Sequence, residues 1–254
     1  MGLRDNIAVI TGAANGIGAA TARRFADEGA RVVVADRDVA HGESVVAAIR
    51  ERGGQALFCA CDVTVEAQVE RVLETTLHAW GAPDIVVNNA GWQLNKPLLD
   101  TTVEEFDAVL RTNLTSMFMF TRNAARLMIE AGKGGSVVNV CSTFAVVGSP
   151  GYTAYHASKG GVASFTRAAA ISLMPYNIRV NAVGPGTVDT PGLHSGARDT
   201  GDEAAGLQGF LALQPLKRFG RPEEIAEVIA FLAADEAGFV TGALWMADGG
   251  YTIV

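Results

Sequence analysis

The sequence predicts an α/β fold: a doubly wound parallel sheet of seven strands with helices on both faces, forming one domain over residues 1–254. Two observations predict this class. Short apolar or β-branched runs alternate with helical segments along the whole chain, which specifies a parallel sheet covered on both faces by right-handed crossovers. The chain is also 49% hydrophobic and 19% charged, with no solenoid repeat, low-complexity tract or linker. Its size and composition therefore suit a single globular domain with a large core.

The first strand–helix–strand unit opens the alternation. An apolar run over 7–10 predicts a buried strand, and a glycine-rich segment over 11–18 follows it at once. Helix-forming residues over 19–28 then end at Gly29, and a β-branched strand over 31–35 ends at Asp36.

This unit has the order of a phosphate-binding turn. Glycines let the backbone approach a ligand without Cβ clashes, and the N-terminus of the next helix attracts a pyrophosphate. Asp36 lies 18 residues after Gly18, where a carboxylate accepts hydrogen bonds from the ribose hydroxyls. The glycine spacing is Gly-x-x-x-Gly-x-Gly instead of the commoner Gly-x-Gly-x-x-Gly, so an ordinary glycine-rich turn is the alternative.

The remaining elements continue the alternation. Thr64 is the expected N-cap of its helix, Thr102 and Glu105 have the spacing of a capping box, and Pro222 suits a first helical position. The expected elements are helix 39–52, strand 56–60, helix 64–80, strand 84–88, helix 102–131, strand 136–142, helix 153–173, strand 178–183, a poorly patterned region to about 214, helix 222–234 and strand 244–247.

Polar and small residues gather where the predicted strands end. Ligands of such sheets bind at the carboxyl ends of the strands, so this edge is the expected site. Asp62 either reaches an adenine amino group or caps the next helix, and Asn113 is an unusual amide within a helix. The residues of this edge are Thr11–Gly18, Asp36, Asp62, Asn88–Gly91, Ser142 and Gly184–Thr190.

Charge and cysteine content exclude several classes of function. Lys and Arg number 20 against 27 Asp and Glu, and the net charge of −7 favours neither nucleic acid nor an anionic membrane as a partner. The chain has no apolar run of transmembrane length and no signal segment, which predicts a cytoplasmic location. Cys59, Cys61 and Cys141 are expected to be buried small hydrophobes without disulfides, and the four scattered histidines predict no metal site.

A phenol and an ammonium lie one helical turn apart in the helix over 153–173. Tyr155 and Lys159 have i, i+4 spacing, and a nearby cation is expected to lower the pKa of the phenol from its ordinary value near 10. The hydroxyl of Ser142, at the end of the preceding strand, is placed to hold a substrate oxygen beside that phenol. Such a pair alone is common on solvated helices, but its combination with a dinucleotide turn predicts acid–base chemistry.

The whole chain resembles the short-chain dehydrogenase/reductase family, in its branch of single-domain members of about 250 residues. The resemblance implies a Rossmann-like fold, with Tyr155 as the acid/base, Lys159 lowering its pKa and holding the nicotinamide ribose, and Ser142 positioning the substrate oxygen. It also implies that Asn113 keeps its helix locally open and holds a water that relays protons. The matching segments are Thr11–Gly18, Asp62, Asn88–Gly91, Asn113, Ser142, Tyr155–Lys159, Pro185–Gly186, Arg218–Glu224 and Asp248–Gly250.

NAD is the expected cofactor. Asp36 would repel the 2′-phosphate of NADP, and residue 15 is Asn where members that resemble NADP users carry Lys or Arg. Arg37 leaves NADP as the less favoured alternative. The resemblance implies cofactor contacts at Gly12, Asn15, Gly16, Ile17, Gly18, Asp36, Arg37, Asp62, Val63, Asn89, Ala90, Gly91, Tyr155, Lys159, Pro185, Gly186, Val188 and Thr190.

The sequence therefore predicts an NAD-dependent oxidoreductase that interconverts a secondary alcohol and a ketone by hydride transfer. The alternatives are a 3-oxoacyl-thioester (acyl-carrier-protein) reductase, a sugar dehydrogenase and a non-enzymatic NAD-binding regulatory protein. A small, uncharged, partly hydrophobic or cyclic substrate is expected, with a flexible lid over residues 186–214. The expected substrate contacts are Ser142, Trp92, Gln93, Phe144, Tyr152 and Leu193, with Val146, His194, Leu207, Phe210 and Leu211 as further candidates.

The family often assembles as a homotetramer through two long helices. The helices over 103–131 and 153–173 carry apolar residues on more than one face, which fits that assembly. We therefore expect an oligomer, with a homotetramer as the favoured form.

Overall fold

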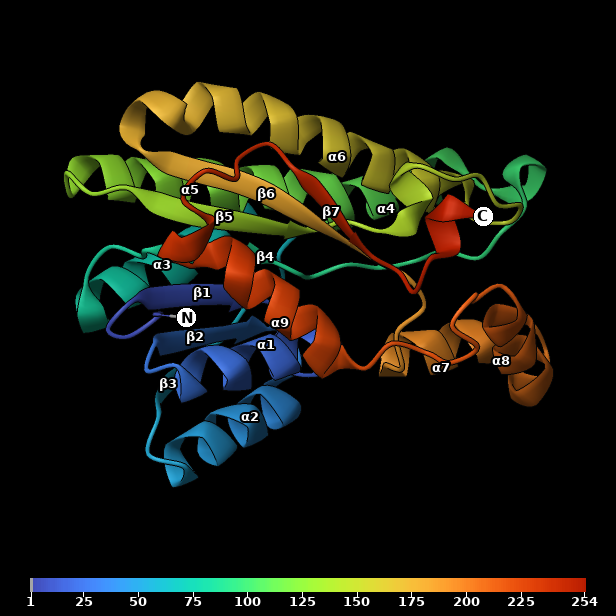
Figure 1. The fold of residues 1–254 in the computed structure, drawn as a ribbon, viewed down its shortest axis with the longest axis horizontal. Coiled ribbons are helices and arrows are strands. Elements are labelled where there is room, and N and C mark those ends of the chain that lie inside the picture. The colour runs from blue at the N-terminus through green and yellow to red at the C-terminus, as the bar shows by residue number, and fades with distance from the viewer. Residues whose placement is uncertain (1) are drawn as a thin grey trace.

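Seven parallel strands form one sheet in the order β3-β2-β1-β4-β5-β6-β7 (Figure 1). The structure is a computed structural model and describes residues 2–254. The order runs outward from β1 in one direction and from β4 in the other, which is the doubly wound topology that the sequence predicts. The strands are β1 Ile7–Thr11, β2 Arg31–Asp36, β3 Gln55–Ala60, β4 Ile85–Asn88, β5 Gly135–Val140, β6 Ile178–Pro185 and β7 Leu244–Ala247.

Helices cover both faces of this sheet, because successive residues of each strand point to opposite sides. In β1, Ala8 and Ile10 pack with Phe25 in one core cluster, whereas Val9 belongs to the cluster on the other face with Phe120. The predicted α/β class and single domain are thus confirmed. One face carries α1 Gly16–Asp27, α2 Val39–Glu51 and α9 Pro222–Ala233, and the other carries α3 Glu66–Trp80, α4 Val103–Leu110, α5 Ser116–Glu130 and α6 Thr153–Leu173.

The predicted helix over 102–131 begins as expected but is not continuous. Thr102 and Glu105 form the capping box, with both hydrogen bonds present. A π-helical turn at Arg111–Thr115 then separates α4 from α5, and it centres on the buried Asn113. One long α-helix was the wrong expectation here, since the amide makes contacts outside the helix.

The predicted N-cap at Thr64 is also wrong. Val65 occupies the N-cap position of α3, and it makes no side-chain capping bond. The Thr64 hydroxyl instead donates a hydrogen bond to the Asp62 carboxylate at 2.7 Å, and the Thr64 N–H donates to the same oxygen at 2.9 Å. Asp62 therefore stabilises the turn between β3 and α3.

The poorly patterned region contains two helices that the sequence does not predict. Helix α7 spans Pro191–Arg198 and is capped by Thr190, and α8 spans Glu203–Ala212 and is capped by Asp202. Figure 1 shows both beyond the carboxyl ends of the strands, separate from the helices that cover the sheet. Both are short: α7 buries only Leu193, Gly196 and Ala197, and α8 has no buried residue, so neither gives a long apolar pattern in the sequence.

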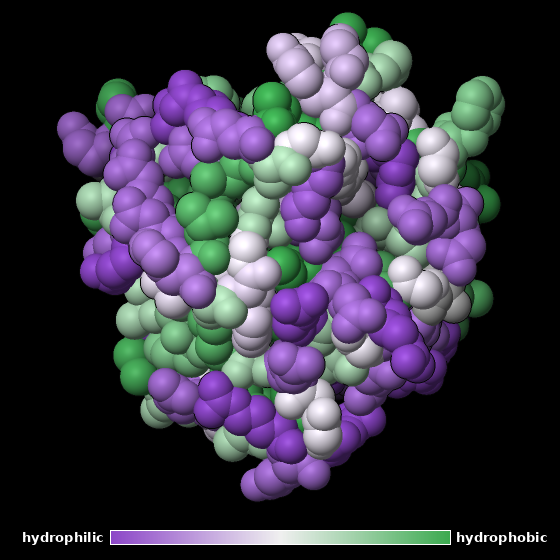
Figure 2. Space-filling view, turned by 90° about the vertical axis from the view of Figure 1, so that its left-hand side faces the viewer, coloured by the Kyte–Doolittle hydropathy of each residue, from purple (hydrophilic) through white to green (hydrophobic). Residues whose placement is uncertain are grey.

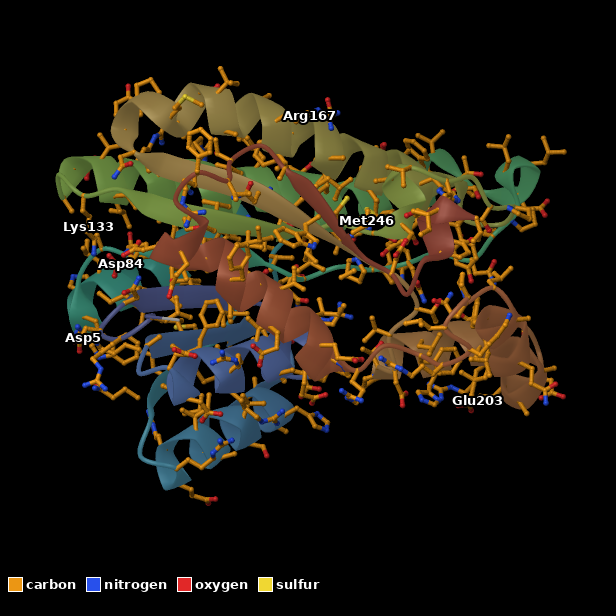
Figure 3. The ribbon with its side chains drawn as sticks, viewed as in Figure 1. Asp5, Asp84, Lys133, Arg167, Glu203 and Met246 are labelled. Carbon is orange, nitrogen blue, oxygen red and sulfur yellow. The ribbon has the colours of Figure 1, made fainter. Side chains whose placement is uncertain are left out.

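The amino ends of the strands lie on the opposite side of the molecule. Asp84 and Lys133 point toward one another there (Figure 3), with 2.6 Å between the carboxylate and the ammonium. The other oxygen of Asp84 accepts a hydrogen bond from the Ile7 N–H at 2.8 Å. Figure 2 shows this side face-on, with hydrophilic residues interspersed among smaller hydrophobic patches. No helix among the described residues is long and apolar enough to cross a membrane.

Candidate active site

The turn between β1 and α1 requires glycine at defined positions. Gly12 has φ +62°, and a Cβ on it would lie 2.8 Å from the Cα of Ala90. A Cβ on Gly18 would overlap the carbonyl oxygen of Gly12. Gly18 therefore allows α1 to approach its own turn, and it does not line the cleft described below. This packing alone requires glycine at position 18, and the expected contact of Gly18 with the cofactor stays a prediction.

The segment Asn88–Gly91 fixes the position of that turn. The Asn89 side-chain amide donates to the carbonyl oxygens of Thr11 and Gly12, both at 2.9 Å. The Thr11 hydroxyl accepts from the N–H groups of Asn89 and Ala90, both at 3.0 Å. These cross-links between β1 and β4 hold the glycine turn at the switch point of the sheet, where dinucleotides bind in folds of this class.

Asp36 stands at the end of β2 with its carboxylate oriented by the backbone. One oxygen accepts a hydrogen bond from the Ala14 N–H at 2.9 Å and the other accepts from the Asp38 N–H at 3.0 Å. Each oxygen keeps a further lone pair for a ribose hydroxyl. A turn that a Cβ would fill, followed by a carboxylate at the next strand end, fits the pyrophosphate and ribose of a dinucleotide.

A cleft of about 800 Å³ runs along the carboxyl ends of the strands. Of the predicted catalytic, cofactor and substrate contacts, leaving aside the further candidates, only Gly18 and Asn113 do not line it. The predicted residues that do line it are Gly12, Asn15, Gly16, Ile17, Asp36, Arg37, Asp62, Val63, Asn89, Ala90, Gly91, Trp92, Gln93, Ser142, Phe144, Tyr152, Tyr155, Lys159, Pro185, Gly186, Val188, Thr190 and Leu193.

Ser142 lies just beyond β5 and faces the first turn of α6. Strand β5 ends at Val140, two residues earlier than predicted, and Ser142 caps the 3₁₀ turn Thr143–Ala145 by accepting from the Phe144 N–H at 3.1 Å. A hydrogen bond joins its hydroxyl to Tyr155. The geometry therefore brings together the two hydroxyls that the sequence predicts to hold and protonate a substrate oxygen.

The expected lowering of the Tyr155 pKa is not present in this structure. Burial raises the pKa of Tyr155 above its ordinary value, and the hydrogen bond with Ser142 offsets only part of that effect. The Lys159 Nζ lies 5.4 Å from the centroid of the Tyr155 ring and donates to the Val140 carbonyl at 2.8 Å. Because the ammonium lies over the ring and is hydrogen-bonded elsewhere, it does not outweigh the loss of solvent around the phenol.

Burial of the Lys159 ammonium is unfavourable in free energy. Its side chain is 3% exposed, and burial lowers its pKa from 10.5 to about 8. An ammonium in such a position loses hydration that one hydrogen bond to a carbonyl does not replace. The cost indicates a residue kept for chemistry and not for stability.

Asn113 lies outside the cleft lining and is hydrogen-bonded to the backbone of Trp92, which lines the cleft. Its Oδ1 accepts from the Trp92 N–H at 2.7 Å, and its Nδ2 donates to the Trp92 carbonyl at 2.8 Å and to the Ser158 hydroxyl at 3.0 Å. The π-helical turn matches the expected local opening of the helix. The side chain bonds to protein groups and positions Trp92, and its role in holding a water stays a prediction from the sequence.

Aromatic rings line the cleft beside Ser142 and Tyr155. Phe144 packs edge-on against Tyr155, with ring centroids 5.9 Å apart, and lies tilted against Tyr152, with centroids 5.5 Å apart. Phe210 also lines the cleft, whereas Val146, His194, Leu207 and Leu211 do not. Sequence reasoning missed Thr143, Ser195, Gly196 and Asp199 as lining residues. The three on α7 and at its end carried no recognisable signal, because the helix that places them was not predicted.

His194 links the two unpredicted helices to the sheet. Its Nδ1 lies 2.9 Å from a Glu203 carboxylate oxygen, and its Nε2 lies 2.9 Å from Asp189. These two carboxylates, Glu203 first, raise the pKa of His194. The side chain therefore connects α7, α8 and the loop after β6.

Metal ligands and thiols are sparse around the cleft. No group of three or more His, Cys, Asp or Glu side chains within residues 2–254 is arranged to hold a metal ion. Cys61 and Cys141 are buried in the wall of the cleft, and Cys59 is only half-buried. Burial raises the pKa of Cys61 to about 12, so this thiol is unreactive.

Comparisons with known proteins agree with this geometry. A family model described as enoyl-(acyl carrier protein) reductase matches residues 12–252. A cis-4-hydroxycyclohexanecarboxylate dehydrogenase of Sinomonas cyclohexanicum is 44% identical, and a cyclopentanol dehydrogenase of Comamonas sp. (strain NCIMB 9872) is 40% identical, each match covering 98% of both chains. A short-chain type dehydrogenase/reductase from Mycobacterium marinum superimposes with a TM-score of 0.94 and 35% identity, covering 100% of this chain and 98% of that one. The chain therefore belongs to the short-chain dehydrogenase/reductase family and is an oxidoreductase that interconverts an alcohol and a ketone with a nicotinamide cofactor.

Proposed function

We propose that this protein is an NAD-dependent dehydrogenase of a small, uncharged, cyclic secondary alcohol. The observation that carries the proposal is the wall of Phe144, Tyr152, Trp92 and Leu193 around the Ser142–Tyr155 hydroxyl pair. Such a wall favours a compact apolar ring and gives no site for a long polar chain. The cyclopentanol dehydrogenase and the hydroxycyclohexanecarboxylate dehydrogenase among the relatives support a cyclic substrate.

Each of these cleft residues has a distinct role in the proposed chemistry. Ser142 donates to and orients the substrate oxygen, and Tyr155 accepts the hydroxyl proton during oxidation or returns it during reduction. The nicotinamide cofactor, when bound, accepts or supplies the hydride. Lys159 holds a positive charge over the phenol ring, and the hydrogen bonds of Asn113 keep Trp92 in place beside the site.

The preference for NAD rests on the end of β2. The Asp36 carboxylate lines the cleft and is fixed by the N–H groups of Ala14 and Asp38. A phosphate on the adenosine ribose would meet this negative charge, whereas a free hydroxyl would donate a hydrogen bond to it. Arg37 also lines the cleft, but its side chain is exposed and offers a phosphate little compensation.

An acyl-carrier-protein substrate is not favoured. Such an acidic partner requires a basic rim, yet Lys96 is paired with Glu105 at 2.8 Å and Arg198 with Glu203 at 3.5 Å. The segment 186–214, including α7 and α8, is the proposed substrate lid.

Exposed Phe118 and Ile129 on α5 and Ile171 on α6 support the proposed homotetramer. A cytoplasmic location stays a prediction from the sequence.

Steady-state kinetics tests the proposal directly. Oxidation of cyclopentanol, cyclohexanol, an acyclic secondary alcohol and a hexose is measured with NAD and with NADP. We expect a cyclic alcohol to give the highest kcat/KM, with NAD favoured at least about tenfold, which corresponds to roughly 1.4 kcal/mol. In Asp36→Ala that cofactor preference should shrink, whereas Asp38→Asn, which keeps a side-chain cap for α2, should retain it. A wild-type preference for NADP, or turnover of the hexose alone, would overturn the proposal.

A further inference from the structure

His156 connects the two elements that carry the Ser142–Tyr155 hydroxyl pair. It follows Tyr155 in the first turn of α6, and its ring lies outside the cleft lining. Its Nδ1 lies 2.9 Å from the carbonyl oxygen of Phe144, in the 3₁₀ turn Thr143–Ala145. A carbonyl oxygen only accepts hydrogen bonds, so the imidazole carries a proton on Nδ1 and donates from α6 to that turn.

The imidazole also stacks on the ring of Phe144. The two ring centroids are 4.4 Å apart and the planes meet at 25°, whereas the Phe144 ring packs edge-on against Tyr155. The Phe144 N–H donates to the Ser142 hydroxyl at 3.1 Å. His156 therefore holds, by its ring and by its Nδ1–H, the residue that both orients the Ser142 hydroxyl and lines the cleft.

The second ring nitrogen of His156 indicates that this position does not serve stability alone. Nε2 is buried and has no hydrogen-bond partner among residues 2–254. With the proton on Nδ1, Nε2 of the neutral ring is an acceptor without a donor, which is unfavourable for a buried atom. A phenylalanine ring would stack on Phe144 without this penalty. The contribution that a phenyl ring cannot make is the hydrogen bond to the Phe144 carbonyl.

We propose that His156 is a positioning residue for the alcohol–ketone reaction, and that its two contacts with Phe144 have separate functions. The Nδ1–H hydrogen bond fixes the backbone of the 3₁₀ turn, so that the Ser142 hydroxyl stays hydrogen-bonded to Tyr155. The stacked ring keeps the Phe144 side chain against the cleft, where it limits the size of the substrate ring. This inference rests on the proposed function, because it takes Ser142 to orient the oxygen of a cyclic alcohol.

Two substitutions separate these contacts. His156→Phe keeps a ring for stacking and loses the Nδ1–H donor, whereas His156→Asn keeps a side-chain N–H donor near the Nδ1 position and loses the ring. The control is His78→Phe, which makes the same exchange at an exposed histidine of α3. For the wild type and each variant, kcat and KM are measured with NAD for cyclopentanol, cyclooctanol and an acyclic secondary alcohol, together with the thermal midpoint.

We expect kcat and stability to change independently of each other. His156→Phe should lower kcat at least about tenfold through misplacement of Ser142. Its thermal midpoint should be no lower than that of the wild type, because the unpartnered Nε2 is removed along with the hydrogen bond. His156→Asn should keep kcat within about threefold, lower the thermal midpoint, and reduce the preference in kcat/KM for cyclopentanol over cyclooctanol about tenfold. His78→Phe should match the wild type in every measurement.

A merely structural histidine would make kcat follow the thermal midpoint in both variants, and that result would overturn the proposal. A wild-type kcat in His156→Phe would also overturn it. An unchanged ratio of cyclopentanol to cyclooctanol in His156→Asn would contradict the role of the stacked ring.

Failure of the proposed function gives a different result. If the wild type oxidises only the acyclic alcohol, the cyclic substrate class is wrong, and the effect of His156→Phe on kcat is measured with that alcohol. The tautomer needs no substrate at all: proton–nitrogen correlation NMR of histidine-labelled protein, with the signal assigned by its loss in His156→Phe, should show the proton on Nδ1. A neutral ring with its proton on Nε2 would contradict the inference.

Discussion

Polar groups lie at both ends of the sheet, but they are used in opposite ways. At the amino end Asp84 binds Lys133 and the Ile7 N–H, and the Arg179 guanidinium donates to the carbonyls of Leu232, Ala233, Ala234 and Val240 at 2.8 to 3.4 Å. At the carboxyl end the buried Lys159 ammonium has one hydrogen-bond partner among the described residues, the Val140 carbonyl. Polar groups whose hydrogen bonds are all made within the protein stabilise the fold. Buried polar groups with few or no protein partners are available to a ligand.

The largest effect is expected at the carboxyl end, from Tyr155→Phe. The variant loses the hydroxyl that exchanges the alcohol proton, so kcat should fall by roughly 10² to 10⁴-fold. Its thermal midpoint should stay close to that of the wild type, because only the hydrogen bond with Ser142 is lost. Tyr176→Phe, at a half-exposed phenol in the 3₁₀ turn after α6, is the matched control and should leave kcat unchanged. A Tyr155→Phe enzyme within a few-fold of wild-type kcat would refute the role of the phenol.

At the amino end, Arg179→Met is expected to lower stability and to leave catalysis unchanged. The change leaves the carbonyls at the end of α9 without their donor, and it should lower the free energy of unfolding by about 3 kcal/mol. Chemical denaturation monitored by circular dichroism measures this value. Arg23→Met, at an exposed arginine of α1, should change it by less than about 0.5 kcal/mol. Equal stability of the two variants would contradict the structural role of Arg179, and the kcat of folded Arg179→Met should match the wild type.

The fold could be predicted because its signals are local. Strands β1 and β2 are buried on both faces along most of their length and contain the continuous apolar or β-branched runs 7–10 and 32–35. The capping box of Thr102 and Glu105 and the first-turn proline at Pro222 mark their helices without any tertiary contact. The strand ends then share one edge by topology alone, so most of the cleft lining could be predicted.

What could not be predicted depends on contacts between distant segments. The π-helical turn at Asn113 exists because that amide binds the backbone of Trp92 and the hydroxyl of Ser158, which lie 21 and 45 residues away. Asp199 reaches the cleft only because α7 folds over it, and α7 is too short to show a helical period. The spacing of Tyr155 and Lys159 indicates that they are neighbours, but not that burial dominates the pKa of the phenol.

The smallest expected effect is a pH-dependent change of stability in Lys159→Met. Burial lowers the pKa of Lys159 to about 8, so between pH 8 and 10.5 the unfolded chain binds more protons at this residue than the folded chain. Stability contributed by this residue therefore rises with pH in that window, and the cost of the buried ammonium is greatest below pH 8. Methionine does not titrate, so Lys159→Met lacks the free-energy penalty of a buried ammonium.

The free energy of unfolding of Lys159→Met relative to the wild type should thus be about 2 kcal/mol more favourable at pH 7 than at pH 10. Tyr155, Cys59 and Cys61, whose pKa values are raised, titrate in both proteins and cancel in the difference. The charge of Lys159 lowers the pKa of Cys141 against the larger effect of burial, so the titration of Cys141 does not cancel in full. Urea denaturation at several pH values measures the difference, and Lys217→Met, at an exposed lysine, should show no such trend. A difference that stays constant from pH 7 to pH 10 would show that Lys159 is not strained by burial. Turnover should be lost in Lys159→Met at every pH, because stability and function make opposite demands on this residue.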